Sequence, residues 1–442
     1  MQGFRNVDDA INNGSLRNQD YLRWFMLVVP VYFFILAAWF IRPLSVSNIS
    51  LAYVAPLTFI TGILLLNVSK SELVNLLMRF KFELPLALVM GLLSILSLIN
   101  SDEPVRILRI LFPAMLPVLL VIQLIALRSI SPQSVERLPR HFLITGFLFA
   151  CIPLLVSQFS GGVYNYVYEG KYRYQGLFDH ESQLSVMVAV MVPLVIGEIA
   201  VSKTTLARWI WMALLIMTFY TSVRIGSKTA LLLSVGFGLF FYFIAHARVQ
   251  SVLKNIFLAM LILVLMVFLG IFGTAIISSI DPTTGAKIEQ IFQGGVENYS
   301  TIQSRTLLWT EAIRVGKQHW LIGTGAGESV LGYNHAHNLI LDYFHGIGIF
   351  GAFAVAALCL CILWRTFNKT LYVMLSKSVT ALDIRILACL SGATIYVLCN
   401  QLSNSFGPAT ISALWMLYIP AVLSEPAKGA KSGPSLSPSH VR

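Results

Sequence analysis

The chain has 442 residues, of which 57% are hydrophobic and only 12% are charged, and its formal net charge is +11. Soluble domains carry about 25% charged residues, so this composition excludes a water-soluble enzyme, a disordered chain and a DNA-binding domain. Its mean hydropathy of +0.76 requires lipid as the solvent, and the surplus of Lys and Arg is typical of the cytoplasmic loops of a membrane protein.

The predicted elements begin with a polar N-terminal segment, residues 1–22, which we expect on the cytoplasmic side without a cleavable signal peptide. Twelve apolar runs of membrane-spanning length follow. Lipid offers the backbone no hydrogen-bond partners and the runs lack the alternation of barrel strands, so each run predicts a transmembrane helix. The predicted spans are 23–41, 51–67, 83–99, 105–127, 141–159, 183–201, 208–223, 228–246, 255–278, 346–364, 384–400 and 408–424.

These spans predict an all-α polytopic membrane protein with about 12 transmembrane helices. Residues 23–278 hold nine of them, 279–345 form a large outer loop, 346–424 hold the last three, and 425–442 form a disordered cytoplasmic tail. With this orientation most of the 31 Lys and Arg residues lie on the cytoplasmic side. In the outer loop, apolar residues at helical spacing predict an amphipathic helix from Ser304 to Val315. The five cysteines all lie in apolar runs and are expected to be small buried hydrophobic residues.

Several cations fall on the predicted outer side, against the general trend. Each one can be explained by contact with lipid headgroups or by pairing with a nearby carboxylate. As a set they also fit a shared anionic ligand, because guanidinium groups bind phosphate oxygens bidentately and lysine adds a point charge. A diphosphate at the membrane surface is the natural ligand of this kind. The cations are Arg106, Arg109, Lys171, Arg173, Arg224, Lys228 and Arg305.

Two further groups in the outer segments can carry function. Five tyrosines crowd the run YNYVYEGKYRY at 164–174, and this run fits an interfacial aromatic belt and a platform for sugar rings about equally well. The run NHAHNLILDYFHG holds three histidines. His335, His337 and Asp342 could ligate a metal, whereas His337 alone, at the entry of a helix, suits a general base. We expect His335 and His345 to cap a helix or face solvent.

The segment from Ser304 to Gly351 resembles the signature of the O-antigen ligase and O-antigen polymerase superfamily, and is closest to O-antigen ligase. A weaker match is IGSKTALLLSV, where Ser227 and Lys228 stand in place of the Ser-Arg that is common in the family. Another is RYQGLFDHESQLS, through Arg173, Gly176, Phe178 and His180. The main signature places Arg305, Leu308, Trp309, Ala312, Gly323, Gly325, Gly327, His337, Asn338, Gly348 and Gly351 at the matching positions.

The resemblance implies a glycosyltransferase in a bacterial inner membrane, with its active site facing the periplasm. The donor would be a glycan on undecaprenyl diphosphate and the acceptor lipid A–core, with no metal, nucleotide or other cofactor and no nucleic-acid partner. His337 and Asn338 would be catalytic. Arg224, Lys228, Arg305, Arg173, His180, Arg106 and Arg109 would bind the diphosphate or the substrate.

Two alternatives to a ligase remain open. An O-antigen polymerase would share the donor and the motifs. A lipid-linked oligosaccharide flippase or transporter would place charges or broken helices near the middle of the bilayer, whereas most ionisable residues here lie at the ends of the predicted spans.

Overall fold

The computed structural model describes several separate stretches of the chain, and every helix and strand belongs to one of them. The predicted spans 23–41, 51–67 and 255–278, most of 228–246, and the two terminal segments lie outside the described residues. The described residues are 69–101, 108–159, 165–168, 171–174, 181–225, 233–236, 238, 279, 300–325, 328–332, 336–376, 378–402 and 408–425.

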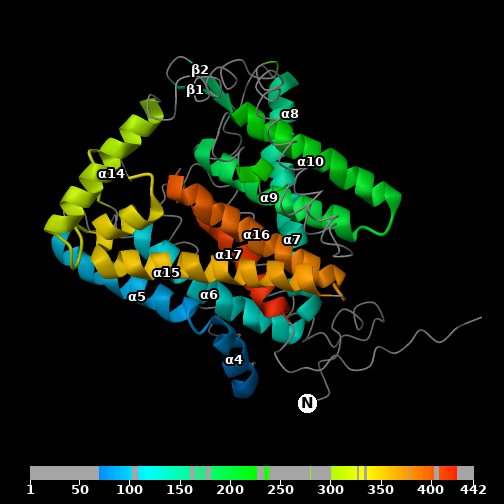
Figure 1. Cartoon of the computed structure of the whole chain (residues 1–442), viewed down its shortest axis with the longest axis horizontal. Helices are drawn as coiled ribbons and strands as arrows, with labels where there is room; N and C mark the ends of the chain where they lie inside the picture. Colours follow the sequence, from blue (N-terminus) through cyan, green and yellow to red (C-terminus); the bar gives the residue numbers. More distant parts are fainter. Residues whose placement is uncertain are drawn as a thin grey trace, which may run out of the picture.

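The described part of the chain is helical apart from one small hairpin (Figure 1). Between Gly146 and Ile152 a π-helical turn joins α7 to α8. The helices are α4 (Lys70–Leu77), α5 (Glu83–Leu96), α6 (Leu108–Ile130), α7 (Pro132–Gly146), α8 (Ile152–Phe159), α9 (Glu181–Val201), α10 (Thr205–Ile225), α14 (Ser300–Gln318), α15 (Leu339–Leu375), α16 (Ala381–Leu402) and α17 (Pro408–Ser424). The hairpin pairs β1 (Asn165–Tyr168) with β2 (Lys171–Tyr174) in antiparallel register.

The chain is a multi-pass membrane protein: six helices among the described residues are long and apolar enough to cross a bilayer. They coincide with six of the predicted spans, and shorter apolar helices at Met115–Ser129 and Leu414–Ser424 overlap two more. The six are Glu83–Asn100, Pro132–Ser157, Gln183–Val201, Thr205–Ile225, Leu339–Leu375 and Ala381–Gln401.

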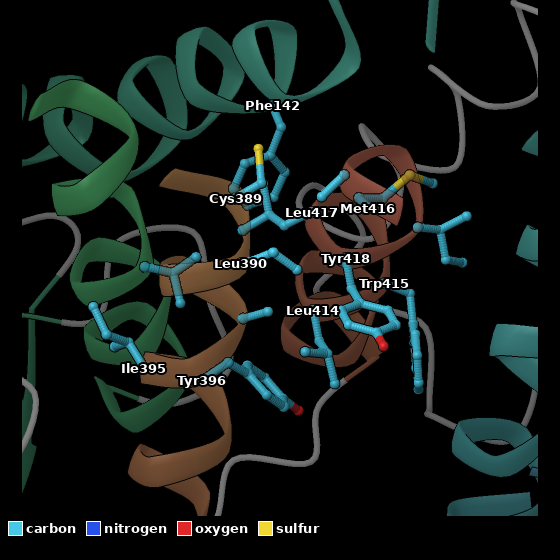
Figure 2. Close-up of a cluster of buried hydrophobic side chains, with 14 of the residues drawn as sticks. Phe142, Cys389, Leu390, Ile395, Tyr396, Leu414, Trp415, Met416, Leu417 and Tyr418 are labelled. Atoms are coloured by element: carbon cyan, nitrogen blue, oxygen red, sulfur yellow. The ribbon is translucent and has the colours of Figure 1, made fainter. Parts of the chain in front are cut away.

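The core lies around α9 and α16, which pack against each other. Both helices are apolar around their whole circumference, as expected of helices surrounded by other helices, and 83% of the spanning segment of each is buried. α17 packs on α16, and its Leu414 and Leu417 lie toward Leu390 and Tyr396 (Figure 2). α10 packs on α9. On the side of α16, α15 packs on α16 and α5 packs in turn on α15 (Figure 1).

The structure corrects the expected fold in two places. The tyrosine-rich run, expected as an irregular part of an all-α protein, forms the β1–β2 hairpin, and buried Tyr174 donates its hydroxyl hydrogen bond to the Ala150 carbonyl at 3.2 Å. The span expected at 346–364 belongs to a much longer helix that starts at Leu339 and is broken at Ile347 and Gly348. The predicted helix at Ser304–Val315 is confirmed as part of α14, and four of the five cysteines are buried as expected.

Ion pairs cluster where the cytoplasmic ends of the helices were expected. Arg365 bonds Glu83 at 2.8 Å, Lys369 bonds Asp383 at 2.7 Å, and Arg385 bonds Glu198 at 2.9 Å. Burying these charges costs desolvation energy, and the pairing offsets part of that cost. They fix which ends of α5, α9, α15 and α16 lie together.

Candidate active site

The start of α15 carries the predicted catalytic pair, and Asn338 caps this helix. Its side-chain Oδ1 accepts a hydrogen bond from the Leu341 backbone N–H at 3.0 Å, as asparagine commonly does at the first turn of a helix. Its Nδ2 donates to the Gln401 carbonyl at the end of α16, at 3.1 Å. Both ends of the amide are therefore engaged, so Asn338 positions the start of α15 against α16.

His337 directly precedes this cap and has a left-handed backbone, with φ of 56°. Residues other than glycine rarely occupy this region, and they do so where the surrounding structure holds them. Here Ala336 is fully buried, and its N–H donates to the Asp342 carboxylate at 2.6 Å. The backbone on both sides of His337 is thus anchored, and the residue as a whole is half-buried.

A few residues further on, α15 breaks at Ile347 and Gly348, and the glycine-rich turn replaces the lost helical hydrogen bonds. The Thr324 N–H donates to the His345 carbonyl at 2.9 Å and the Gly325 N–H to the Gly346 carbonyl at 3.1 Å. In return, the Ile349 N–H donates to the Trp320 carbonyl at 2.8 Å. Buried backbone groups must be paired in lipid or protein, so this pairing makes the break a stable feature of the helix.

Two glycines are required by the close approach of these backbones. A Cβ on Gly323, which has φ of 79°, would lie 2.4 Å from the Gly346 carbonyl carbon. A Cβ on Gly348 would lie 2.3 Å from the Leu321 oxygen, and its φ of 82° and ψ of −172° belong to a region that only glycine occupies readily. The spacing of the glycines in the sequence thus reflects the close packing of these two backbones.

Substitution of Gly348 by alanine should therefore destabilise the protein by about 3 kcal/mol or more, because the strained backbone and the contact with the Leu321 carbonyl add. Gly332 provides a matched control, since its φ is 78° but a Cβ there would meet nothing within 4 Å. Thermal unfolding in detergent should show a much larger fall in melting temperature for Gly348→Ala than for Gly332→Ala. Equal losses would mean that the close approach does not matter.

Arg305 lies on α14, the helix that crosses the broken end of α15 (Figure 1). Leu308 and Ala312 follow Arg305 at helical spacing, and they form a small buried cluster with Ala336 and Val330. Arg305 therefore shares the helix face that packs beside His337. Burial lowers the pKa of the Arg305 guanidinium, and within the described stretches no hydrogen bond or ion pair engages it. A half-buried cation in this setting is well placed to receive an anion.

The ends of two other helices hold the glycine-rich turn in place. Asn100, just after α5, donates from Nδ2 to the Gly323 carbonyl at 2.9 Å, and the Ser101 hydroxyl donates to Glu328 at 2.9 Å. Together with the Asn338–Gln401 contact, these bonds bring the ends of α5 and α16 to the start of α15. All these segments were expected on the outer side of the membrane, and the structure gathers them at one end of the bundle.

Arg224 occupies the last turn of α10, at the same end of the bundle. The ion pair from Arg385 to Glu198 joins the first turn of α16 to the last turn of α9, so these two helices are antiparallel. α10 returns alongside α9 after a short turn, so Arg224 lies at the same end as Gln401. Strand β2 also contacts α10, which brings the backbone of Arg173 to this end.

For the other predicted site residues the structure gives less. The backbone of Arg109 belongs to α6. Four others fall outside the described residues: Lys228, His180, Arg106 and His335. The expectation that His345 caps a helix or faces solvent is wrong, because it is 4% exposed and its carbonyl and ring contact Thr324. Asn100, Ser101, Thr324 and Gln401 were not predicted. For Asn100 and Ser101, the only signal in the sequence is that two polar residues follow directly after an apolar run.

Of the residues in the metal-binding alternative, His337 and Asp342 belong to the described part of the chain and His335 lies outside it. No group of three or more His, Cys, Asp or Glu side chains in the described part is arranged to hold an ion. Asp342 uses its carboxylate to accept the Ala336 N–H. The site as described is a cationic, histidine-containing surface at one end of the helix bundle, with its backbone fixed by hydrogen bonds.

Comparison with known proteins agrees with this description. The model of the O-antigen ligase family matches residues 212–356, a region that includes Arg224, α14, the glycine-rich turn, His337 and the break in α15. No curated protein matches the chain. The resemblance to the O-antigen ligase superfamily that was predicted from the sequence is confirmed by this match.

Proposed function

We propose that this chain, which is similar to O-antigen ligases over residues 212–356, transfers a glycan from undecaprenyl diphosphate to lipid A–core. The reaction would take place at the periplasmic face of a bacterial inner membrane. The acceptor hydroxyl oxygen attacks the first sugar carbon of the donor, the bond from that carbon to the diphosphate oxygen breaks, and undecaprenyl diphosphate leaves. The hydroxyl proton passes to a base on the protein.

The observation that carries the proposal is the position of His337 beside the Arg305 face of α14. A sugar hydroxyl is a weak nucleophile, and a neutral imidazole within hydrogen-bond reach accepts its proton as the new bond forms. The structure supports this role, because the backbone of His337 is anchored by Ala336 and Asn338 and the residue is half-buried. We assign it the role of general base.

The departing diphosphate needs positive charge at the same place. Preorganised cations stabilise the charge that develops on a leaving group, and they act most strongly where water is partly excluded. Arg305 satisfies both conditions, because it is half-buried and unpaired within the described residues. We assign Arg305 and Arg224 to the diphosphate, with Lys228, Arg173, His180, Arg106 and Arg109 as further contacts. No metal ion or nucleotide is part of the proposed reaction.

The structure supports an enzyme over a transporter in one respect. A broken membrane helix is a common feature of transporters, where the free backbone groups bind the cargo. In α15 these groups are instead paired with the glycine-rich turn through Thr324, Gly325 and Trp320. The break therefore serves to hold the loop that carries the site.

The product distinguishes the proposed ligase from the alternatives. Purified protein in liposomes, supplied with undecaprenyl-diphosphate-linked glycan and lipid A–core, should yield lipid A–core bearing glycan, and it should continue to do so in excess chelator. Longer undecaprenyl-linked chains would identify a polymerase. Movement of the donor across the bilayer without any new glycosidic bond would identify a transporter and contradict the proposal.

A further inference from the structure

A cavity lies between α7, α9 and α16 at the end of the bundle opposite to His337. Its position follows from α16, whose first turns hold Arg385 at the cavity and whose last turn contacts Asn338. The inner wall is apolar and includes Leu143, Leu194 and Ala388. The mouth is charged and includes Arg137, Arg140, Arg385, Glu136 and Glu198.

The arginines at the mouth differ in how closely a carboxylate pairs with them. Glu198 is almost fully buried, and it accepts hydrogen bonds from Arg385 Nε at 2.9 Å and from a terminal amino group of the same side chain at 3.3 Å. The opposite charges of Glu198 and Arg385 therefore neutralise each other. Arg140 approaches Glu198 only to 3.9 Å and lies over the Trp211 ring, 5.8 Å from its centroid. Its guanidinium therefore keeps most of its hydrogen-bonding capacity.

Arg137 adds a second cation on the same face of α7, one turn before Arg140. Among the described residues its only hydrogen bond is to the neutral Gln133 side chain, at 3.1 Å. The turn between α9 and α10 supplies more positive charge nearby. There the Ser202 hydroxyl bonds the Glu198 carbonyl at 2.6 Å, and Arg208 donates to the Ser202 carbonyl at 3.1 Å. The lining holds three arginines against the two carboxylates Glu136 and Glu198, so the mouth carries a net positive charge, to which nearby Arg208 adds.

This combination fits one class of ligand. Guanidinium groups bind phosphate oxygens as a planar fork, and basic pockets between membrane helices suit anionic lipid headgroups. The mouth also lies against α10, because Arg140 packs over the Trp211 ring. A phospholipid bound there keeps its hydrocarbon in the bilayer beside α10, whereas a free phosphate has no hydrocarbon to place. Nearby, Leu206, Trp209 and Ile210 expose large apolar surfaces on α10, as expected where a helix faces lipid.

We infer that the mouth of the cavity binds an anionic phospholipid, with the headgroup phosphate held by Arg137 and Arg140 and the hydrocarbon lying in the bilayer beside α10. The site is distinct from the His337 site and lies at the other end of the same helices. It would tie the positions of α7, α9 and α16 to the anionic lipid content of the bilayer.

The test measures lipid retention by native mass spectrometry of the full-length protein, released from nanodiscs that contain phosphatidylglycerol in a phosphatidylcholine background. Arg140→Gln and Arg137→Gln should each reduce the affinity for phosphatidylglycerol roughly fivefold, the value of one basic residue near a membrane surface. Lys70→Gln is the matched control, because Lys70 is exposed on α4 and does not line the cavity. Its retention of phosphatidylglycerol should be unchanged.

Both arginine variants keep the buried Glu198–Arg385 pair, so we expect them to fold. Equal losses in Arg140→Gln and Lys70→Gln would overturn the inference, because lipid would then be responding to general surface charge. Glycerol phosphate is the probe for a soluble anion. If it displaces phosphatidylglycerol at millimolar concentration, the cavity is a phosphate site without a lipid requirement, and the inference is wrong in its ligand.

Discussion

Replacement of His337 by asparagine should reduce the rate of glycan transfer about 10²- to 10⁴-fold, the usual value of a general base. Asparagine is the informative substitution because His337 has a left-handed backbone with φ of 56°, and asparagine tolerates this conformation better than alanine does. The variant should therefore keep its fold and lose only the proton acceptor. Single-turnover transfer of radiolabelled glycan to lipid A–core would measure the loss.

The control for this substitution is His319→Ala. His319 lies at the end of α14, is exposed, and is not part of the proposed chemistry, so the rate should be unchanged. His345 is unsuitable as a control, because it is buried against Thr324 and its loss would disturb the glycine-rich turn. Donor binding to His337→Asn, measured separately, should be near normal. Weak donor binding with a normal rate of the bound complex would show that His337 holds substrate and is not the base.

The fold could be predicted from the sequence where one simple physical rule decides it. Lipid forces each long apolar run into a helix, so the positions of α9, α10 and α16 followed from composition alone. The helix at Ser304–Val315 followed from the spacing of its apolar residues. These elements need no information about distant parts of the chain.

The break in α15 and the burial of His345 could not be predicted in the same way. Both depend on the backbone of residues 320–325 lying against residues 345–349, a contact between segments that are distant in sequence. An apolar run that contains Gly346 and Gly348 reads locally as the start of a span, and this is why the predicted span began too late. The hairpin was missed for a similar reason, since Tyr174 is held by the Ala150 carbonyl.

The site was predicted in part because its residue types are unusual in their positions. A histidine and several cations on the predicted outer side of a membrane protein needed an explanation, and this led to His337, Arg305 and Arg224. Asn100 and Gln401 could not be predicted, because both act through contacts with backbone carbonyls. The Asn100 side chain donates to the Gly323 carbonyl, and the Gln401 carbonyl accepts from the Asn338 side chain. Such roles leave no pattern in a single sequence.

Arg305 offers the sharpest test of how the leaving group is stabilised. Arg305→Ala should lower the transfer rate roughly 10- to 150-fold, because loss of one hydrogen bond to a charged group costs about 1.5–3 kcal/mol. The matched control is Arg314→Ala on the same helix. Arg314 is exposed and is paired with Glu311 at 2.7 Å, and a surface pair of this kind contributes little. The rate of that variant should stay within about twofold of the wild-type rate.

Arg305→Lys separates charge from geometry. Lysine keeps the positive charge but lacks the planar fork that binds two phosphate oxygens at once, so its rate should fall between those of the wild type and Arg305→Ala. Because Arg305 is half-buried and its pKa is lowered by burial rather than raised by a protein carboxylate, removing it leaves no described acid unpaired. The fold should therefore persist in both Arg305 variants. A wild-type rate in Arg305→Ala would mean that this arginine contacts lipid headgroups, and Arg224 would then be left as the main diphosphate contact.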